Sequence, residues 1–254
     1  MNKRGLILVA VWLASSLTMS CRKTVDLAGS AWTASVVQNG TGGVYTPFSM
    51  TFLCNSDCSG RAFFVEKYEN DPVPYGVSLP FSYVWDGEEG TLTLDDGISG
   101  IQLPLRYERA ERNTLVVDFS PMHDYYPQYA GWRLFALERV EYCRTAQLDG
   151  SHWAFSYNPV LSDTAVDAID IYELDFASSS AMLKFTRIQG SEGDTLVATW
   201  DIPEWHFSNG IGDALLRNTS LGVSFSASFY LPDAAQLLLF DGESMLPFAS
   251  DALK

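Results

Sequence analysis

The segment LAGSAW at residues 27–32 returns later in the chain as LDGSHW at residues 148–153. Each copy opens a stretch with the alternation of a β-strand. Several pairs of similar segments in matching order indicate a duplicated chain, with one domain at residues 27–140 and a second at residues 148–254. The further pairs are Thr51-Phe52 with Asp175-Phe176, Val84-Trp85-Asp86 with Thr199-Trp200-Asp201, and Thr114-Leu115-Val116-Val117 with Gln236-Leu237-Leu238-Leu239.

The sequence predicts an all-β protein. Apolar and polar residues alternate along residues 101–108 and 221–229, as in strands that have one buried face. The second half offers about seven strands, with residues 212–217 expected to form a short helical turn. We predict two tandem antiparallel meander barrels of about eight strands each, because closure into a barrel removes exposed strand edges. The other strands of the first half are expected near residues 31–37, 48–54, 61–68, 80–85, 91–95, 114–119 and 132–139.

The L-x-G-S-x-W opening followed by a meander that closes in a strand ending at Arg139 resembles the lipocalin-like domains of lipoproteins from Gram-negative gut anaerobes. The resemblance covers both halves of the chain. It implies that Trp32 and Trp153 plug the closed end of each barrel. It also implies that a ligand enters a barrel at the opposite, open end.

The N-terminus has the order of a secretion signal. Two basic residues, Lys3 and Arg4, precede an apolar stretch at residues 5–14 and then a run of small residues. The alternative is a membrane-spanning helix, but crossing ~30 Å of hydrocarbon takes about 20 apolar residues. We therefore expect residues 1–20 to be a signal peptide that is removed.

The segment LTMSC at residues 17–21 resembles the lipobox of bacterial lipoproteins. The resemblance implies that the Cys21 thiol is acylated and that fatty acyl chains such as palmitate hold the mature protein on a bilayer. Each buried CH₂ contributes ~0.8 kcal/mol to such an anchor. Residues 21–26 then form a lipidated tether.

The residues after Cys21 favour an outer-membrane location. Arg22 stands where an aspartate would resemble an inner-membrane retention signal. Residues 22–26 (RKTVD) lack the acidic run that resembles a surface-export tag. We expect the periplasmic face of the outer membrane rather than the cell surface.

The chain is acidic, with a formal net charge of −15. Such a charge argues against nucleic acid and against anionic membrane faces as partners, because both would be repelled. The apolar share of 47% is enough for packed cores. The partners expected are the lipid bilayer and either a small apolar ligand or an envelope protein.

Cysteine spacing predicts one disulfide. Cys54 and Cys58 bracket three residues between two strand-like runs, and an oxidising envelope favours a Cys54–Cys58 bridge across a tight hairpin. The alternative, a metal pair, lacks a second Cys or His pair nearby. Cys143 is expected to be a free thiol or an alternative partner.

No recognised catalytic motif occurs in the sequence, and the three histidines, His123, His152 and His206, lack metal-ligand spacing. We therefore expect no cofactor, no metal and no catalytic residue. The predicted function is non-catalytic: capture of a small apolar ligand or docking of an envelope protein. The alternative is an envelope hydrolase whose carboxylates converge only in the fold.

Two further sets of residues are candidate sites. Tyr125, Tyr126 and Tyr129 lie in an aromatic loop at one rim of the first barrel, where they form either an apolar plug or a lid over a ligand. Thr164 and Thr195 each follow an aspartate and precede an apolar residue, which resembles an acceptor for envelope O-glycosylation.

Overall fold

The computed structural model describes eight stretches of the chain and shows an all-β protein. Residues 1–20, Cys21, Tyr126, Tyr129 and Thr164 lie outside the described residues. The predictions made on them therefore stay predictions. The described stretches are residues 24–39, 45–68, 71–108, 113–125, 133–159, 168–178, 180–189 and 193–250.

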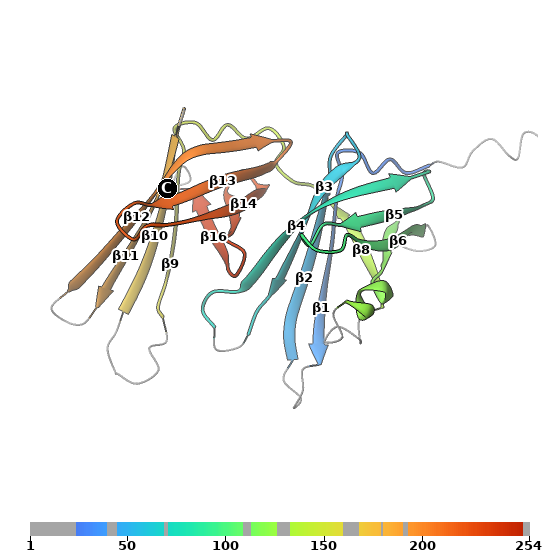
Figure 1. The fold of residues 1–254 in the computed structure, drawn as a ribbon, viewed down its shortest axis with the longest axis horizontal. Coiled ribbons are helices and arrows are strands. Elements are labelled where there is room, and N and C mark those ends of the chain that lie inside the picture. The colour runs from blue at the N-terminus through green and yellow to red at the C-terminus, as the bar shows by residue number, and fades with distance from the viewer. Residues whose placement is uncertain are drawn as a thin grey trace, which may run out of the picture.

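The first eight strands form a closed antiparallel barrel (Figure 1). Each strand pairs with the next, and β1 closes the barrel by pairing with β8, with Trp32 opposite Arg139. A 3-10 helix, η1 (Ser120–Asp124), lies between the last two strands. The strands are β1 (Ala31–Asn39), β2 (Tyr45–Cys54), β3 (Ser59–Glu66), β4 (Tyr75–Trp85), β5 (Glu89–Leu94), β6 (Ile101–Glu108), β7 (Thr114–Asp118) and β8 (Leu134–Val140).

The second eight strands form another closed antiparallel barrel, in which β9 pairs with both β10 and β16. The prediction of two tandem meander barrels is confirmed. The strands are β9 (His152–Tyr157), β10 (Ala168–Ala177), β11 (Ser180–Gln189), β12 (Asp194–Ser208), β13 (Ile211–Asn218), β14 (Val223–Asp233), β15 (Gln236–Phe240) and β16 (Met245–Ser250).

The helical turn expected at residues 212–217 is wrong, because this segment is strand β13. Its neighbours β12 and β14 both pair with it, and Ala214 and Leu216 point into the core. Sheet pairing on two sides thus outweighs the helix propensity of its Ala and Leu residues. The second barrel consequently has eight strands, where the sequence of the second half alone indicated about seven.

The repeated segment has the same structure in both barrels. In the first, the Trp32 indole N–H donates to Ser30 Oγ at 2.7 Å, and Gly29 has a φ of 63°. In the second, Trp153 donates to Ser151 Oγ at 2.8 Å, and the corresponding glycine has a φ of 75°. Only glycine adopts such a φ without steric cost, which explains why the motif keeps it. Both tryptophans are buried in their barrel's core, at 1% and 3% exposure.

One of the matched segment pairs, Thr51-Phe52 with Asp175-Phe176, is out of register by two residues. Ser30 O accepts from Cys54 N, whereas Ser151 O accepts from Phe176 N. The structural counterpart of Phe176 is therefore Cys54 and not Phe52. The other matched segments lie on strands that have the same position in each barrel. β4 and β12 are the fourth strands, and β7 and β15 are the seventh.

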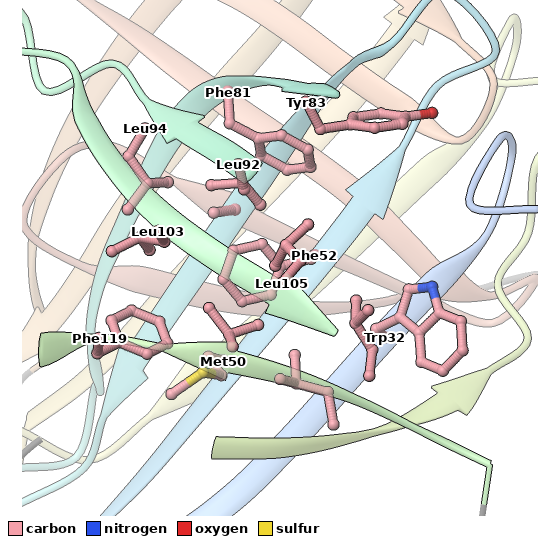
Figure 2. Packing of buried hydrophobic residues seen from close by; sticks show 14 of the residues in the cluster. Trp32, Met50, Phe52, Phe81, Tyr83, Leu92, Leu94, Leu103, Leu105 and Phe119 are labelled. Carbon is pink, nitrogen blue, oxygen red and sulfur yellow. The ribbon is translucent and has the colours of Figure 1, made fainter. Parts of the chain in front are cut away.

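The first barrel is filled by large apolar side chains (Figure 2). Phe52 lies at its centre, with its ring 5.8 Å from that of Phe81 and 6.5 Å from that of Phe119. Met122 of η1 also packs against this core. The remaining labelled residues in Figure 2 are Trp32, Met50, Tyr83, Leu92, Leu94, Leu103 and Leu105.

An apolar interface joins the two barrels, which stand side by side in Figure 1. Phe63 of β3 points outward from the first barrel, and its ring lies 4.5 Å from that of Tyr230 and 4.8 Å from that of Phe240. Backbone hydrogen bonds extend the contact, since Gly76 N donates to Glu243 O at 3.1 Å. The barrels therefore pack as one unit.

Candidate ligand site in the second barrel

The candidate site lies inside the second barrel, at the end away from Trp153. Side chains alternate between the two faces of a strand, so the even-numbered residues of β10 share one face. Leu174 and Phe176 on this face are buried in the barrel core. Asp170 and Tyr172 continue the same face and therefore point into the barrel.

Exposure rises along the inside of this barrel. Trp153 and Leu174 are buried, whereas the inward-facing Phe155, Tyr157 and Phe185 are only half-buried. An inward-facing side chain keeps contact with solvent only where the barrel interior is accessible. We infer that the second barrel is open at this end.

Aromatic rings line the open end. The rings of Phe155 and Tyr157 are stacked with centroids 5.6 Å apart, and Tyr157 and Tyr172 are nearly parallel, with 12° between their planes. Phe185 extends the series, 5.0 Å from Tyr172. Aromatic side chains of this kind offer large apolar contact area to a ligand.

A buried ion pair lies beside these rings. The strand register places Asp170 opposite Arg187, and the guanidinium donates from Nε and Nη2 to the two carboxylate oxygens, both at 2.6 Å. The Asp170 side chain is 0% exposed, whereas that of Arg187 is 30% exposed and faces the open end. The Arg187 guanidinium also lies 5.6 Å from the ring centroid of Phe185. Such a bidentate pair is strong and fixes the orientation of the guanidinium.

The surroundings keep the two tyrosines neutral and Arg187 charged. Burial raises the pKa of Tyr157, and the hydrogen bond to Asp170 raises it further. Burial likewise raises the pKa of Tyr172. The hydrogen bonds to Asp170 raise the pKa of Arg187. The two tyrosines therefore stay uncharged and Arg187 stays protonated near neutral pH.

Trp200 of β12 contributes an unused donor. Its ring packs against the core of the second barrel, and its indole N–H is buried without a hydrogen-bond partner among the described residues. A buried donor left unpaired costs about 1–3 kcal/mol. A ligand with an acceptor group near Trp200 would recover this cost.

The predicted aromatic loop is placed only in part. Residues 121–132 do join the last two strands of the first barrel. Tyr125 follows η1 and is 52% exposed, so it does not act as a plug. Met122 fills that role instead.

The predicted glycosylation residue Thr195 is accessible. It lies near the start of β12 and is exposed, and its hydroxyl donates to Gly193 O at 3.0 Å. Its modification stays a prediction.

Cys54 is the last residue of β2, and Cys58 lies in the turn before β3. The β2–β3 register pairs Cys54 with Gly60, and Cys58 lies in the turn with a φ of 63°. The two cysteines are therefore not paired with each other in the strand register, and both are free thiols in the structure, Cys54 buried and Cys58 exposed. Their disulfide stays a prediction. Cys143 is also a free thiol and packs against the second core.

Two clefts, of about 400 Å³ and about 630 Å³, lie at the junction of the barrels. Arg61 of the first barrel bridges to Asp213 of the second at 2.8 Å, and Ser228 Oγ donates to the same carboxylate oxygen at 2.9 Å. Glu204 lines the larger cleft, and His206 lines both. Among the residues that the structure describes, no three His, Cys, Asp or Glu side chains gather into a metal-binding group.

Comparisons with models of known protein families, with characterised proteins and with solved structures find no match to this chain. Within the described stretches, no helix combines the length and the apolar character needed to cross a membrane.

Proposed function

We propose that this protein is a non-catalytic envelope lipoprotein whose second barrel binds a small, largely apolar ligand. The observation that carries the proposal is the half-buried aromatic lining of this barrel. Phe155, Tyr157, Tyr172 and Phe185 all face the interior, yet each keeps some solvent contact. Ligand sites typically combine such an apolar wall with a few convergent polar groups, here the Asp170–Arg187 pair.

The same cluster favours binding over hydrolysis. A general acid or base needs a carboxyl group that can exchange a proton with the substrate. Asp170 is instead fully buried, and Arg187 engages both of its oxygens. At the barrel junction, Arg61 and Ser228 both engage Oδ1 of Asp213.

The lipid anchor completes the proposal. Residues 1–20 direct secretion, and an acylated Cys21 holds the two barrels at the periplasmic face of the outer membrane. The charge of the chain fits this arrangement, because an acidic domain stays off anionic lipid while its acyl chains remain inserted. The ligand site is then carried on a tether at residues 21–26.

Fluorescence of N-phenyl-1-naphthylamine, an uncharged apolar probe, tests ligand binding. We expect saturable enhancement with the wild type and a loss of affinity of about tenfold with Tyr172→Ala, which removes a ring from the wall. Tyr125→Ala is the control, because Tyr125 is exposed on the other barrel. Equal binding by all three proteins, or no saturable binding by any, contradicts a ligand site in the second barrel.

A further inference from the structure

The polar groups inside the second barrel select the kind of ligand. Arg187 carries five N–H donors, and Asp170 engages those on Nε and Nη2 without using the rest. Because Asp170 is 0% exposed and Arg187 is 30% exposed, a ligand entering from the open end meets the guanidinium first. The carboxylate lies behind it.

Donors outnumber acceptors at this end of the barrel. Besides the remaining N–H groups of Arg187, the buried indole N–H of Trp200 lacks a partner among the described residues. Both Asp170 oxygens already accept from Arg187. A complementary ligand therefore brings hydrogen-bond acceptors.

The charge balance decides between a neutral and an anionic acceptor. The negative charge of Asp170, 2.6 Å away, balances the positive charge of Arg187. The pair therefore offers no net attraction to an anion. An anion would lose its hydration in the barrel without gaining an uncompensated positive partner. The net charge of −15 also repels anions from the protein as a whole.

We infer that the second barrel takes an uncharged ligand with an apolar, planar body and an acceptor oxygen, such as a carbonyl or ether, and that the Asp170–Arg187 pair excludes anionic analogues. This inference rests on the proposed binding function. The stacked rings of Phe155, Tyr157 and Tyr172 receive the planar body. A free donor of Arg187 or the indole N–H of Trp200 receives the oxygen.

Two probes that share one ring system test the charge selection. N-phenyl-1-naphthylamine is neutral, and 1-anilinonaphthalene-8-sulfonate adds a sulfonate to the same rings. We expect wild-type protein to bind the neutral probe at least about tenfold more tightly, which corresponds to about 1.4 kcal/mol. If neither probe binds, the proposed function fails at this site. If the sulfonate binds as tightly as the neutral probe, only the charge selection fails.

Variants of the Asp170–Arg187 pair test whether this pair causes the charge selection. Asp170→Asn leaves Arg187 charged without its partner, so affinity for the sulfonate should rise about tenfold while that for the neutral probe stays within about twofold. Arg187→Gln makes the opposite change, because it leaves a lone carboxylate and should weaken sulfonate binding below the wild-type level. Arg187→Gln also tests the inference if the Asp170→Asn variant does not fold. An unchanged ratio of the two affinities in the folded variants overturns the inference.

The matched control is Glu173→Gln. Glu173 pairs with Lys184 at 2.8 Å on the same two strands, β10 and β11, but on the outer face of the barrel. Removing this charge changes the protein's net charge as much as Asp170→Asn does. We expect both probe affinities to remain at the wild-type values. A rise in sulfonate affinity equal to that of Asp170→Asn would show that overall charge, and not the interior pair, sets the selection.

Acceptor recognition has its own measurement with an uncharged naphthyl ketone, 6-propionyl-2-(dimethylamino)naphthalene. Trp200→Phe removes the indole N–H and keeps an aromatic ring. We expect it to weaken binding of the ketone several-fold and to leave N-phenyl-1-naphthylamine binding unchanged. Equal effects on the two probes would show that Trp200 contributes packing only and would overturn its role as a donor.

Discussion

The interface between the barrels can be tested by Phe63→Ala. Phe63 is 1% exposed and packs between the rings of Tyr230 and Phe240, at 4.5 and 4.8 Å. Replacing a fully buried phenylalanine by alanine loses apolar burial and leaves a cavity, which costs about 3–5 kcal/mol. For a chain of this size, each 1 kcal/mol lowers the melting temperature by about 2–4 °C. We therefore expect a fall of roughly 6–20 °C.

Urea unfolding, followed by tryptophan fluorescence and by circular dichroism, provides the measurement. Because the lost contacts join the two barrels, Phe63→Ala should also separate a single transition into two. The control is Phe64→Ala on the same strand. Phe64 points into the first barrel, where its ring lies 6.0 Å from that of Phe52, so its loss should destabilise that barrel without uncoupling the pair. A loss below about 1 kcal/mol for Phe63→Ala, with the wild-type shape of the unfolding curve, would refute a packed interface.

The remaining predictions concern single residues outside the interface. Burial raises the pKa of the Cys54 thiol to about 12, so native protein should be alkylated rapidly at the exposed Cys58 and slowly at Cys54; mass spectrometry showing neither site alkylated before reduction would instead establish their disulfide. Because the unfolded thiol ionises near its ordinary value of 9.0, the contribution of Cys54 to the free energy of unfolding should fall as the pH rises from 9.0 towards about 12, and Cys54→Ala should remove this part of the pH dependence. Cys21→Ala should abolish labelling by radioactive palmitate and detergent-phase partitioning, and a labelled variant would contradict acylation at that residue. Thr195→Ala should remove a glycan mass from native protein, whereas an unmodified Thr195 peptide from the wild type would end that hypothesis.

The strands of the first barrel were predictable because their sequence alternates clearly. In β6, Ile101, Leu103 and Leu105 are buried and the residues between them are exposed, as the pattern requires. Strand β13 was not predictable in this way, because its Ala and Leu residues suit a helix equally well. Only pairing with β12 and β14, which lie on either side of it in the barrel, settles its conformation.

The ligand site was missed for a related reason. Ile169 and Ile171 flank Asp170 and share the opposite face of β10, so the alternation in this part of the strand suggests that the isoleucines, and not Asp170, point inside. Arg187 is its partner only through the β10–β11 register. A charged residue within an apolar run is a signal that sequence reasoning can use, because such a residue is rarely buried without a partner. The identity of that partner requires the fold.

The two duplicated barrels differ at the position of the ion pair. Trp32 faces Phe52 in the first barrel, and Trp153 faces Leu174 in the second, so the two registers can be compared from that end. Counting four residues back along the second strand of each barrel reaches Phe48 in the first and Asp170 in the second. Phe48 is 6% exposed and belongs to the core, which continues apolar packing where the second barrel has its ion pair.

Arg187 has no counterpart in the first barrel either. The residue opposite Phe48 on β3 is Glu66, whereas the residue opposite Asp170 on β11 is Arg187. A phenylalanine and a glutamate cannot form the bidentate pair that orients a guanidinium toward the open end. Both barrels thus keep the glycine and tryptophan motif, while the residues that would meet a ligand have diverged. The first barrel packs against the second through Phe63, and the second barrel carries the polar groups that we propose select the ligand.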